Sequence, residues 1–365
     1  MHEPVDVIQL GIFASRIAAI CDEMGSVLRR SAFSPNIRDR LDFSCAVFDA
    51  EGELCAQAAH IPVHLGSMAY AMRSIVSTQR WRPGDMLVVN DPFLGGTHLP
   101  DVTVIAPVFV ADRCVAFVAN RAHHANIGAI SPGSMPISST LEQEGVVIAP
   151  SLIMQDERLN RPLLNQLAGL PSSLEWDEQH LPDHPALGDF LAQISSNRAG
   201  VASLTRWVCA QGAGYFADQL RQLNDYGERL ARAEIKKIPA GVYRAEDCLD
   251  DDGLGRFDIV IKLQLKITAD GSVEADFTGS AQQVEGNVNC PLSVAAAAVF
   301  YVFRCLMPSY APACAGLFRP IKLFAPSGSL VNANRPAAVA AGNVETSTRI
   351  VDVVLKALAE ALPQR

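Results

Sequence analysis

The sequence predicts an α+β fold with mixed, mainly antiparallel sheets combined with helices. Segments with alternating apolar residues, typical of strands, follow one another across short turns rather than through long crossovers. Segments with apolar residues every three to five positions, typical of helices, are grouped in other parts of the chain. At 365 residues the chain can form one large or two ordinary domains. We expect two regions, residues 1–239 and residues 240–365.

The N-terminal part is expected to contain one helix followed by hairpins. Apolar residues recur at helical spacing in the first segment and predict the buried face of an amphipathic helix: Ile8, Ile12, Ile17, Ile20, Met24 and Val27. Arg29 and Arg30 close this segment, where cations suit a helix C-terminus. The turn Asp49-Ala-Glu-Gly52 interrupts one alternating segment, and Ala111-Asp-Arg113 interrupts another. In chain order, the expected elements are a helix over 5–30, a hairpin over 41–57, a strand over 86–89, and a hairpin over 102–110 and 114–119.

Longer helical periods replace the alternation after residue 159, and alternation returns after the turn Pro239-Ala-Gly241. The last helix presents Ile350, Val353 and Leu358 on one face, which we expect to be uncovered and to favour self-association or partner binding. The expected elements are two helices within 187–230, three strands within 243–277, a helix over 294–307, a strand over 321–325, and a helix over 347–362 with its N-cap near Thr346 or Ser347.

Composition excludes several classes of protein. Lys and Arg total 30 against 39 Asp and Glu, a net charge of −9, so the basic surface of a nucleic-acid binder is lacking. The nine cysteines never form a Cys-x-x-Cys pair, which favours reduced thiols over disulfides or a zinc site. The sequence shows neither a secretory leader pattern nor an apolar run of membrane-spanning length. We therefore expect a cytoplasmic protein with no nucleic-acid or membrane partner.

The densest polar run, residues 90–101, directly follows an expected strand. His98 and Asp101 lie three residues apart in this run, and His123 or His124 follows the next hairpin. Two imidazoles and one carboxylate suit a catalytic Mn, Fe or Zn ion with open coordination positions. The alternative is that these side chains only anchor loops through hydrogen bonds.

Two other polar groups are weaker candidates for a site. His60 and His64 lie four residues apart, but Pro62 between them favours an extended turn over one helical face. One structural and one exposed histidine is the alternative. Glu142 and Glu144 lie in a hydroxyl-rich loop, where helix capping explains them as well as substrate contact does. The chain has no phosphate-binding loop, convincing dinucleotide fingerprint or nucleophile elbow, so no nucleotide cofactor is expected on it.

A series of motifs resembles the hydantoinase B / 5-oxoprolinase family over nearly the whole chain. They are Arg29-Arg-Ser-Ala-Phe-Ser-Pro35, Asp42-Phe-Ser-Cys45, His60-Ile-Pro-Val-His-Leu-Gly-Ser-Met68, the run 90–101, Ala119-Asn-Arg-Ala-His-His124 and Gly342-Asn-Val-Glu-Thr-Ser347. Such an ordered series is specific for the family but not for one substrate. The resemblance implies part of an ATP-dependent cyclic-amide hydrolase of the 5-oxoprolinase or N-methylhydantoinase type, or the metal-binding subunit of an acetone carboxylase-like enzyme.

The resemblance also implies a set of metal ligands on this chain and separate roles for this chain and a partner. His98, Asp101 and His123 match a Thr-His-x-x-Asp element and the first residue of a His-His pair, which bind manganese in the carboxylase branch. A hydantoinase A type partner would bind ATP and phosphorylate the ring carbonyl of a 5-oxoproline or hydantoin. This chain would then complete ring opening by water, with His124 or Glu144 as the general base.

Other implications of the resemblance are looser. His60, His64 and Asp91 are weaker candidates for contacts with substrate. Family members usually continue beyond the Gly-Asn-Val-Glu-Thr-Ser motif into a glycine-rich region, so we expect a C-terminally shortened member that is inactive without its partner. The alternatives to cyclic-amide hydrolysis are metal-dependent carboxylation of a ketone and a non-catalytic scaffold.

Overall fold

The computed structural model describes residues 7–363 except 60, 62, 132 and 178–183. The helices are α1 (Val7–Ser31), α2 (Pro35–Arg38), α3 (His64–Thr78), α4 (Arg161–Leu167), α5 (Pro185–Gln211), α6 (Ala213–Ile235), α7 (Leu292–Cys305) and α8 (Glu345–Ala361). The strands are β1 (Phe43–Asp49), β2 (Leu54–Ala59), β3 (Met86–Val89), β4 (Asp101–Val110), β5 (Arg113–His123), β6 (Ser151–Gln155), β7 (Arg158–Leu159), β8 (Gly241–Asp251), β9 (Phe257–Ile267), β10 (Val273–Asp276) and β11 (Ile321–Phe324). Short 3-10 helices include η1 (Pro92–Leu94) and η2 (Leu141–Glu144).

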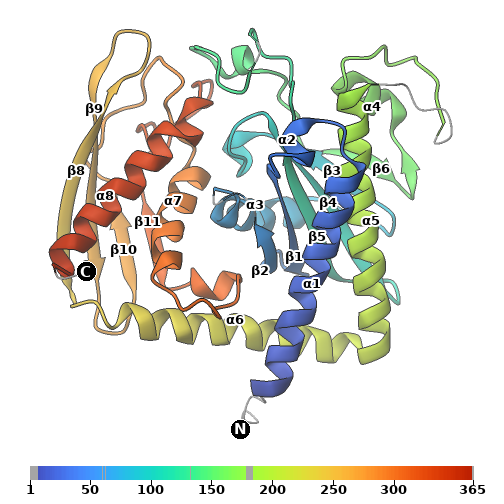
Figure 1. Ribbon diagram of the computed structural model, residues 1–365, viewed down its shortest axis with the longest axis horizontal. Coiled ribbons are helices and arrows are strands. Elements are labelled where there is room, and N and C mark those ends of the chain that lie inside the picture. Colours follow the sequence, from blue (N-terminus) through green and yellow to red (C-terminus); the bar gives the residue numbers. More distant parts are fainter. Residues whose placement is uncertain (1–6, 60, 62, 132, 178–183, 364–365) are drawn as a thin grey trace.

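The first sheet is antiparallel, with the strand order β2-β1-β5-β4-β3-β6-β7. Helices cover both of its faces, α1 and α5 on one and α3 on the other (Figure 1). Neighbouring residues of β1 therefore enter different cores: Val47 packs toward α1 and α5, and Phe48 packs toward α3. This two-sided cover explains why the first eight residues of β4 are all buried.

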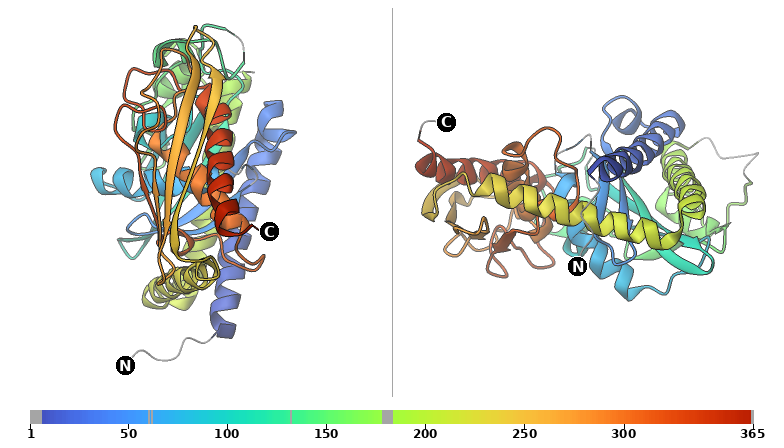
Figure 2. Two further views of the ribbon diagram at one scale, coloured as in Figure 1. Left: turned by 90° about the vertical axis from the view of Figure 1, so that its left-hand side faces the viewer. Right: turned by 90° about the horizontal axis from the view of Figure 1, so that it is seen from below.

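The second sheet has the order β11-β10-β9-β8, and only its β10–β11 pair is parallel. Buried residues alternate with more exposed ones along β9, because α7 and α8 cover one face of this sheet. Helix α3 packs against α7 and so joins the two parts. Helix α6 runs along the edge of both parts (Figures 1 and 2). No helix in the described part of the chain has both the length and the apolarity to cross a bilayer.

The structure confirms the predicted α+β class and both predicted hairpins, with boundaries within a few residues. It corrects the buried face of α1, because Ile8 and Ile12 are 75% and 58% exposed. Leu10 and Phe13 are buried there instead, whereas Ile17 is buried as expected. The expected division at residue 239 stays a prediction; this position lies between the two sheets in the chain.

The C-terminal helix differs from its prediction in two respects. Helix α8 begins at Glu345 with Val344 at its N-cap, and no side chain caps it. Its apolar face is buried within the chain, since Ile350, Val353 and Leu358 belong to the core beneath the second sheet. The expectation that this face is uncovered was therefore wrong, and self-association or partner binding stays a prediction.

Candidate metal centre

Three neighbouring strands of the first sheet bring polar side chains to one edge. Asp101 begins β4 and His123 ends β5, and the two residues are direct partners in the antiparallel ladder. On the other side of β5, the His123 N–H donates to the carbonyl oxygen of Asp42 (3.0 Å) just before β1. Asp42, His123 and Asp101 therefore form a row across the ends of β1, β5 and β4.

Two further histidines reach this row from outside the sheet. His98 lies in the tight turn between η1 and β4, where Gly95 adopts a left-handed φ of 95°. The turn is also tight at Gly96, because an added Cβ would lie 2.7 Å from the Asp91 carbonyl oxygen. His64 is the first residue of α3 and faces the row from the helix layer.

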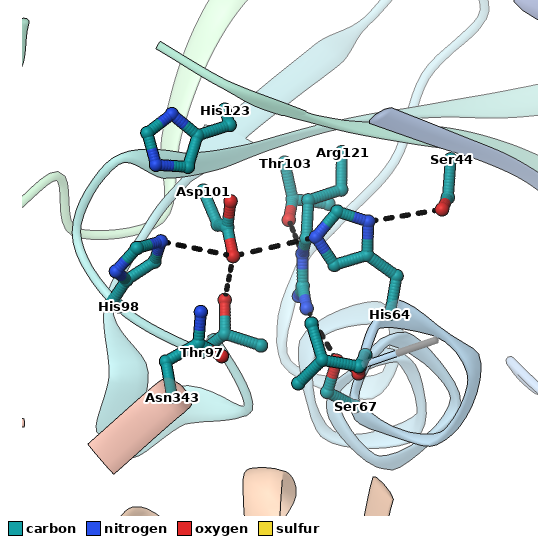
Figure 3. A network of polar contacts seen from close by, with 12 residues as sticks. Ser44, His64, Ser67, Thr97, His98, Asp101, Thr103, Arg121, His123 and Asn343 are labelled. Carbon is teal, nitrogen blue, oxygen red and sulfur yellow. Dashed lines mark hydrogen bonds and ion pairs between the residues drawn. The ribbon is translucent and has the colours of Figure 1, made fainter. Parts of the chain in front are cut away.

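Asp101 is the centre of the resulting cluster (Figure 3). Its Oδ2 atom lies 3.4 Å from His64 Nε2 and 3.5 Å from His98 Nε2, and it also accepts from the Thr97 hydroxyl. His98, Asp101 and His123 offer one ligand atom each within 4.8 Å of one another. Asp42, His64 and Asp101 form a second such group. Asp101 thus belongs to both groups.

The cluster fits a divalent cation because several of its buried atoms lack partners. His98 Nδ1 and Asp101 Oδ1 form no hydrogen bond with a described residue, and His98 Nε2 has only its 3.5 Å contact with Asp101 Oδ2. Buried polar atoms without partners are costly unless a ligand satisfies them. Imidazole nitrogens with carboxylate oxygens are a donor set that Mn, Fe and Zn accept. Asn36 Nδ2 lies 3.1 Å from His123 Nδ1 and orients that ring.

The electrostatics favour the ionised carboxylate of Asp101 and the neutral imidazole of His123, the forms that bind a metal. Burial works against ionisation of Asp101, but His98 and His64 outweigh it and keep the pKa of this carboxyl well below its usual value. Burial lowers the pKa of His123, which favours the neutral imidazole. Burial and the neighbouring Asp101 charge raise the pKa of Asp42. A cation at the cluster would offset the electrostatic repulsion between the Asp42 and Asp101 carboxylates.

The cluster opens into a cavity of about 550 Å³ between the two parts of the molecule. One end is formed by the clustered residues Asp42, His64, His98, Asp101 and His123. The rest of the wall consists of Arg40, Ile61, Val63, Ser134, Met135, Ala297, Ala298, Tyr301, Asn343, Val344, Ser347, Thr348 and Val351. One end is therefore polar, and helices α7 and α8 supply much of the apolar wall.

The choice between the paired histidines follows from strand geometry. Successive residues at the end of β5 point to opposite faces of the sheet, so His123 and His124 diverge. His124 turns toward α5, where its Nε2 lies 2.9 Å from Gln193 Oε1 and its ring packs on Phe190 at 4.3 Å between centroids. Burial lowers the pKa of His124. Of the pair, His123 contributes to the cavity wall.

The other predicted site residues are scattered around the cluster. Glu144 lies at the end of η2, and its Oε1 accepts from the N–H groups of Val339 and Ala340, at 2.9 Å each. Its Oε2 has no hydrogen-bond partner among the described residues, and burial raises the pKa of Glu144. Asp91 caps η1 and pairs with Arg335. His60 lies outside the described residues, so its predicted contact with substrate stays untested.

Sequence reasoning missed Asp42 as a member of the cluster. The signal was present, because Asp42 directly precedes an alternating segment in the same way as Asp101. Only the antiparallel pairing of β1 with β5 places the start of β1 beside the end of β5. His64 was predicted as a weaker substrate contact, and the structure places it on the cavity wall.

Comparisons with known proteins identify relatives of the chain. The chain is 36% identical to an uncharacterised protein of Methanocaldococcus jannaschii, over 99% of this chain and 63% of that protein. It is 37% identical to 5-oxoprolinase 1 of Arabidopsis thaliana, over 96% of this chain but only 29% of the plant protein. The chain therefore spans less than two thirds of the length of these relatives.

Two solved structures share the fold. The ATP-dependent caprolactamase of Pseudomonas jessenii superposes with a TM-score of 0.88 and 25% identity, over 100% of this chain and 62% of that chain. Acetone carboxylase superposes with a TM-score of 0.82 and 19% identity, over 98% of this chain and 48% of that one, which shows the fold alone. A profile of the Hydantoinase B/oxoprolinase family matches residues 6–365. The chain belongs to the hydantoinase B/oxoprolinase family.

Proposed function

We propose that this chain supplies the metal-bearing site of an ATP-dependent cyclic-amide hydrolase. The observation that carries the proposal is the cluster of His98, Asp101 and His123, with unpartnered buried donor atoms, at the end of a cavity. Family membership supports the same reaction class. So does the caprolactamase, since caprolactam is a cyclic amide and that enzyme is ATP-dependent.

His98, Asp101 and His123 would hold a Mn, Fe or Zn ion, and Asp42 lies close enough to Asp101 to complete the set. A divalent cation here would polarise a bound carbonyl group and lower the pKa of a bound water. His64 contributes by holding Asp101, since its other ring nitrogen is fixed by Ser44 Oγ at 3.0 Å. These contacts would keep the Asp101 carboxylate oriented toward the cavity.

We propose His124 and Glu144 as the candidate general bases. Glu144 is the first to test, because Oε2 is unpartnered and the carboxyl interacts electrostatically with His98. His64 and Asp91 remain candidates for contacts with substrate, and His64 lies in the cavity wall. We also propose a hydantoinase A type partner that binds ATP and phosphorylates the amide carbonyl. We retain the cytoplasm as the expected compartment.

Reconstitution tests the proposal most directly. The chain would be combined with a hydantoinase A type partner, ATP, and a panel of 5-oxoproline, hydantoins and caprolactam. We expect phosphate release coupled to ring opening, and loss of ring opening in His98→Ala. Turnover of small ketones with bicarbonate instead would indicate carboxylation. Complex formation without phosphate release on any substrate would indicate a non-catalytic scaffold.

A further inference from the structure

The side chain of Arg121 is buried directly beneath the metal cluster. It is 2% exposed and lies two residues before His123 on β5. Its ladder partners are Ser44 on β1 and Thr103 on β4, so these three residues form a second row across the sheet. Because side chains two residues apart share a face, this row supports the row of Asp42, His123 and Asp101.

The guanidinium contacts segments that carry other members of the cluster (Figure 3). Its Nε donates to Thr103 Oγ1 at 2.9 Å, two residues after Asp101. Its Nη2 donates to the Gly95 carbonyl oxygen at 3.2 Å, in the turn that leads to His98.

The remaining arm of the guanidinium reaches helix α3. Its Nη1 donates to Ser67 Oγ at 2.7 Å, one helical turn after His64. Ser67 Oγ in turn donates to the Val63 carbonyl oxygen at 2.8 Å, at the N-cap of that helix. The three hydrogen bonds therefore tie together the segments that supply Asp101, His98 and His64, while β5 itself supplies His123.

The charge of Arg121 has no direct counterion. Its three partners are neutral oxygens, and no carboxylate of a described residue lies within ion-pair distance of it. Burial lowers the pKa of Arg121 to about 10, and the Asp101 charge opposes this effect. Burying a cation costs free energy. We therefore expect Arg121 to have a role that depends on its planar set of fixed hydrogen-bond donors.

We propose that Arg121 is a positioning residue that sets the spacing of the metal ligands. The inference rests on the metal centre proposed above. Lysine would keep the charge but would not reproduce three hydrogen bonds in one plane. Methionine would remove both the charge and the hydrogen bonds. Either change should loosen the ligand set without removing a ligand.

Dissociation constants for Zn²⁺ and Mn²⁺ test this role, measured by calorimetry on the wild-type chain, Arg121→Lys and Arg121→Met. We expect each variant to bind roughly 10- to 100-fold more weakly, the usual effect of losing a residue that orients metal ligands. The Mn²⁺ electron paramagnetic resonance spectrum should also broaden. Arg319→Lys is the matched control, because Arg319 also joins distant segments, through Glu53 and Asp225, but touches none that carries a ligand. It should bind as the wild type does.

Wild-type affinity in either folded Arg121 variant would overturn the role. If neither variant folds, Ser67→Ala and Thr103→Val remove one hydrogen bond each, and unchanged affinity in both would equally overturn it. A wild-type chain that binds neither ion would overturn the metal centre and this role together. Failure of the chain to open any cyclic amide would refute only the proposed reaction, because the affinities are compared without turnover.

Discussion

Replacing Gly66 by alanine should destabilise the protein through one close helix contact. Gly66 lies on α3, two residues after His64, where α3 crosses α7. An added Cβ would lie 2.9 Å from Ala297 Cα and 2.7 Å from Phe300 Cδ2. The phenyl ring can rotate, but the Ala297 backbone cannot, so the helices must separate by about 0.5 Å to regain a 3.4 Å contact. This separation would carry His64 away from Asp101.

The magnitude follows from two opposing effects. Overpacking costs about 1–3 kcal/mol, whereas alanine in place of glycine stabilises a helix by about 1 kcal/mol. Gly11→Ala is the matched control, because Gly11 is exposed on α1 and an added Cβ meets nothing within 4 Å. The helix preference cancels between the two variants, which leaves a difference of about 1–3 kcal/mol in the free energy of unfolding.

Equilibrium denaturation in urea measures both variants against the wild type. We expect Gly11→Ala to be slightly more stable than the wild type and Gly66→Ala to be less stable than Gly11→Ala by the stated difference. Equal stabilisation of both variants would refute the close α3–α7 contact and, with it, the reasoning that this contact holds His64 at the cluster.

Two further predictions concern the C-terminal part. Gly342→Ala should cost about 3 kcal/mol or more in the free energy of unfolding, because the added Cβ would lie 1.9 Å from the Asn289 carbonyl oxygen; a wild-type melting temperature would contradict this. Asp247→Asn should lower stability by at most about 1 kcal/mol near neutral pH, as expected for an ion pair whose Lys356 side chain is 53% exposed to solvent. The hydrogen bond from Lys356 is the main cause that lowers the pKa of Asp247 to about 2. Because this pKa is depressed, the stabilisation is present above the unfolded value of about 3.9 and is lost as the pH falls toward 2. The unfolding free energies of the wild type and Asp247→Asn should converge as the pH falls across this range. A difference that stays constant with pH would refute the stabilising interaction of Asp247 with Lys356.

The hairpins were predictable because their signal is local. The turn at Ala111-Asp-Arg113 and the alternation on both sides fix which residues of β4 and β5 face each other, and this register places Asp101 opposite His123. His98 follows from its proximity to Asp101 in the sequence. These three residues were therefore accessible from sequence, although the family resemblance was needed to choose His123 over His124.

The features that sequence reasoning missed depend on contacts between segments that are distant in the chain. Helix α3 was missed because Pro62 favoured a turn; the helix begins only two residues later, at His64. Asp42 joins the cluster only through the pairing of β1 with β5, which no local pattern specifies. The exposed Ile8 and Ile12 show the same limit, since the face of α1 that is buried depends on where α5 and the sheet lie.

The metal content of the purified chain tests the central claim most directly. Elemental mass spectrometry should find near-stoichiometric Mn, Fe or Zn in the wild type and its loss in His98→Ala and Asp101→Ala, because each variant removes a ligand from one centre. His124→Gln is the control, and it should retain the metal because its imidazole faces Gln193 and Phe190. Wild-type metal content in both His98→Ala and Asp101→Ala would contradict the proposed centre.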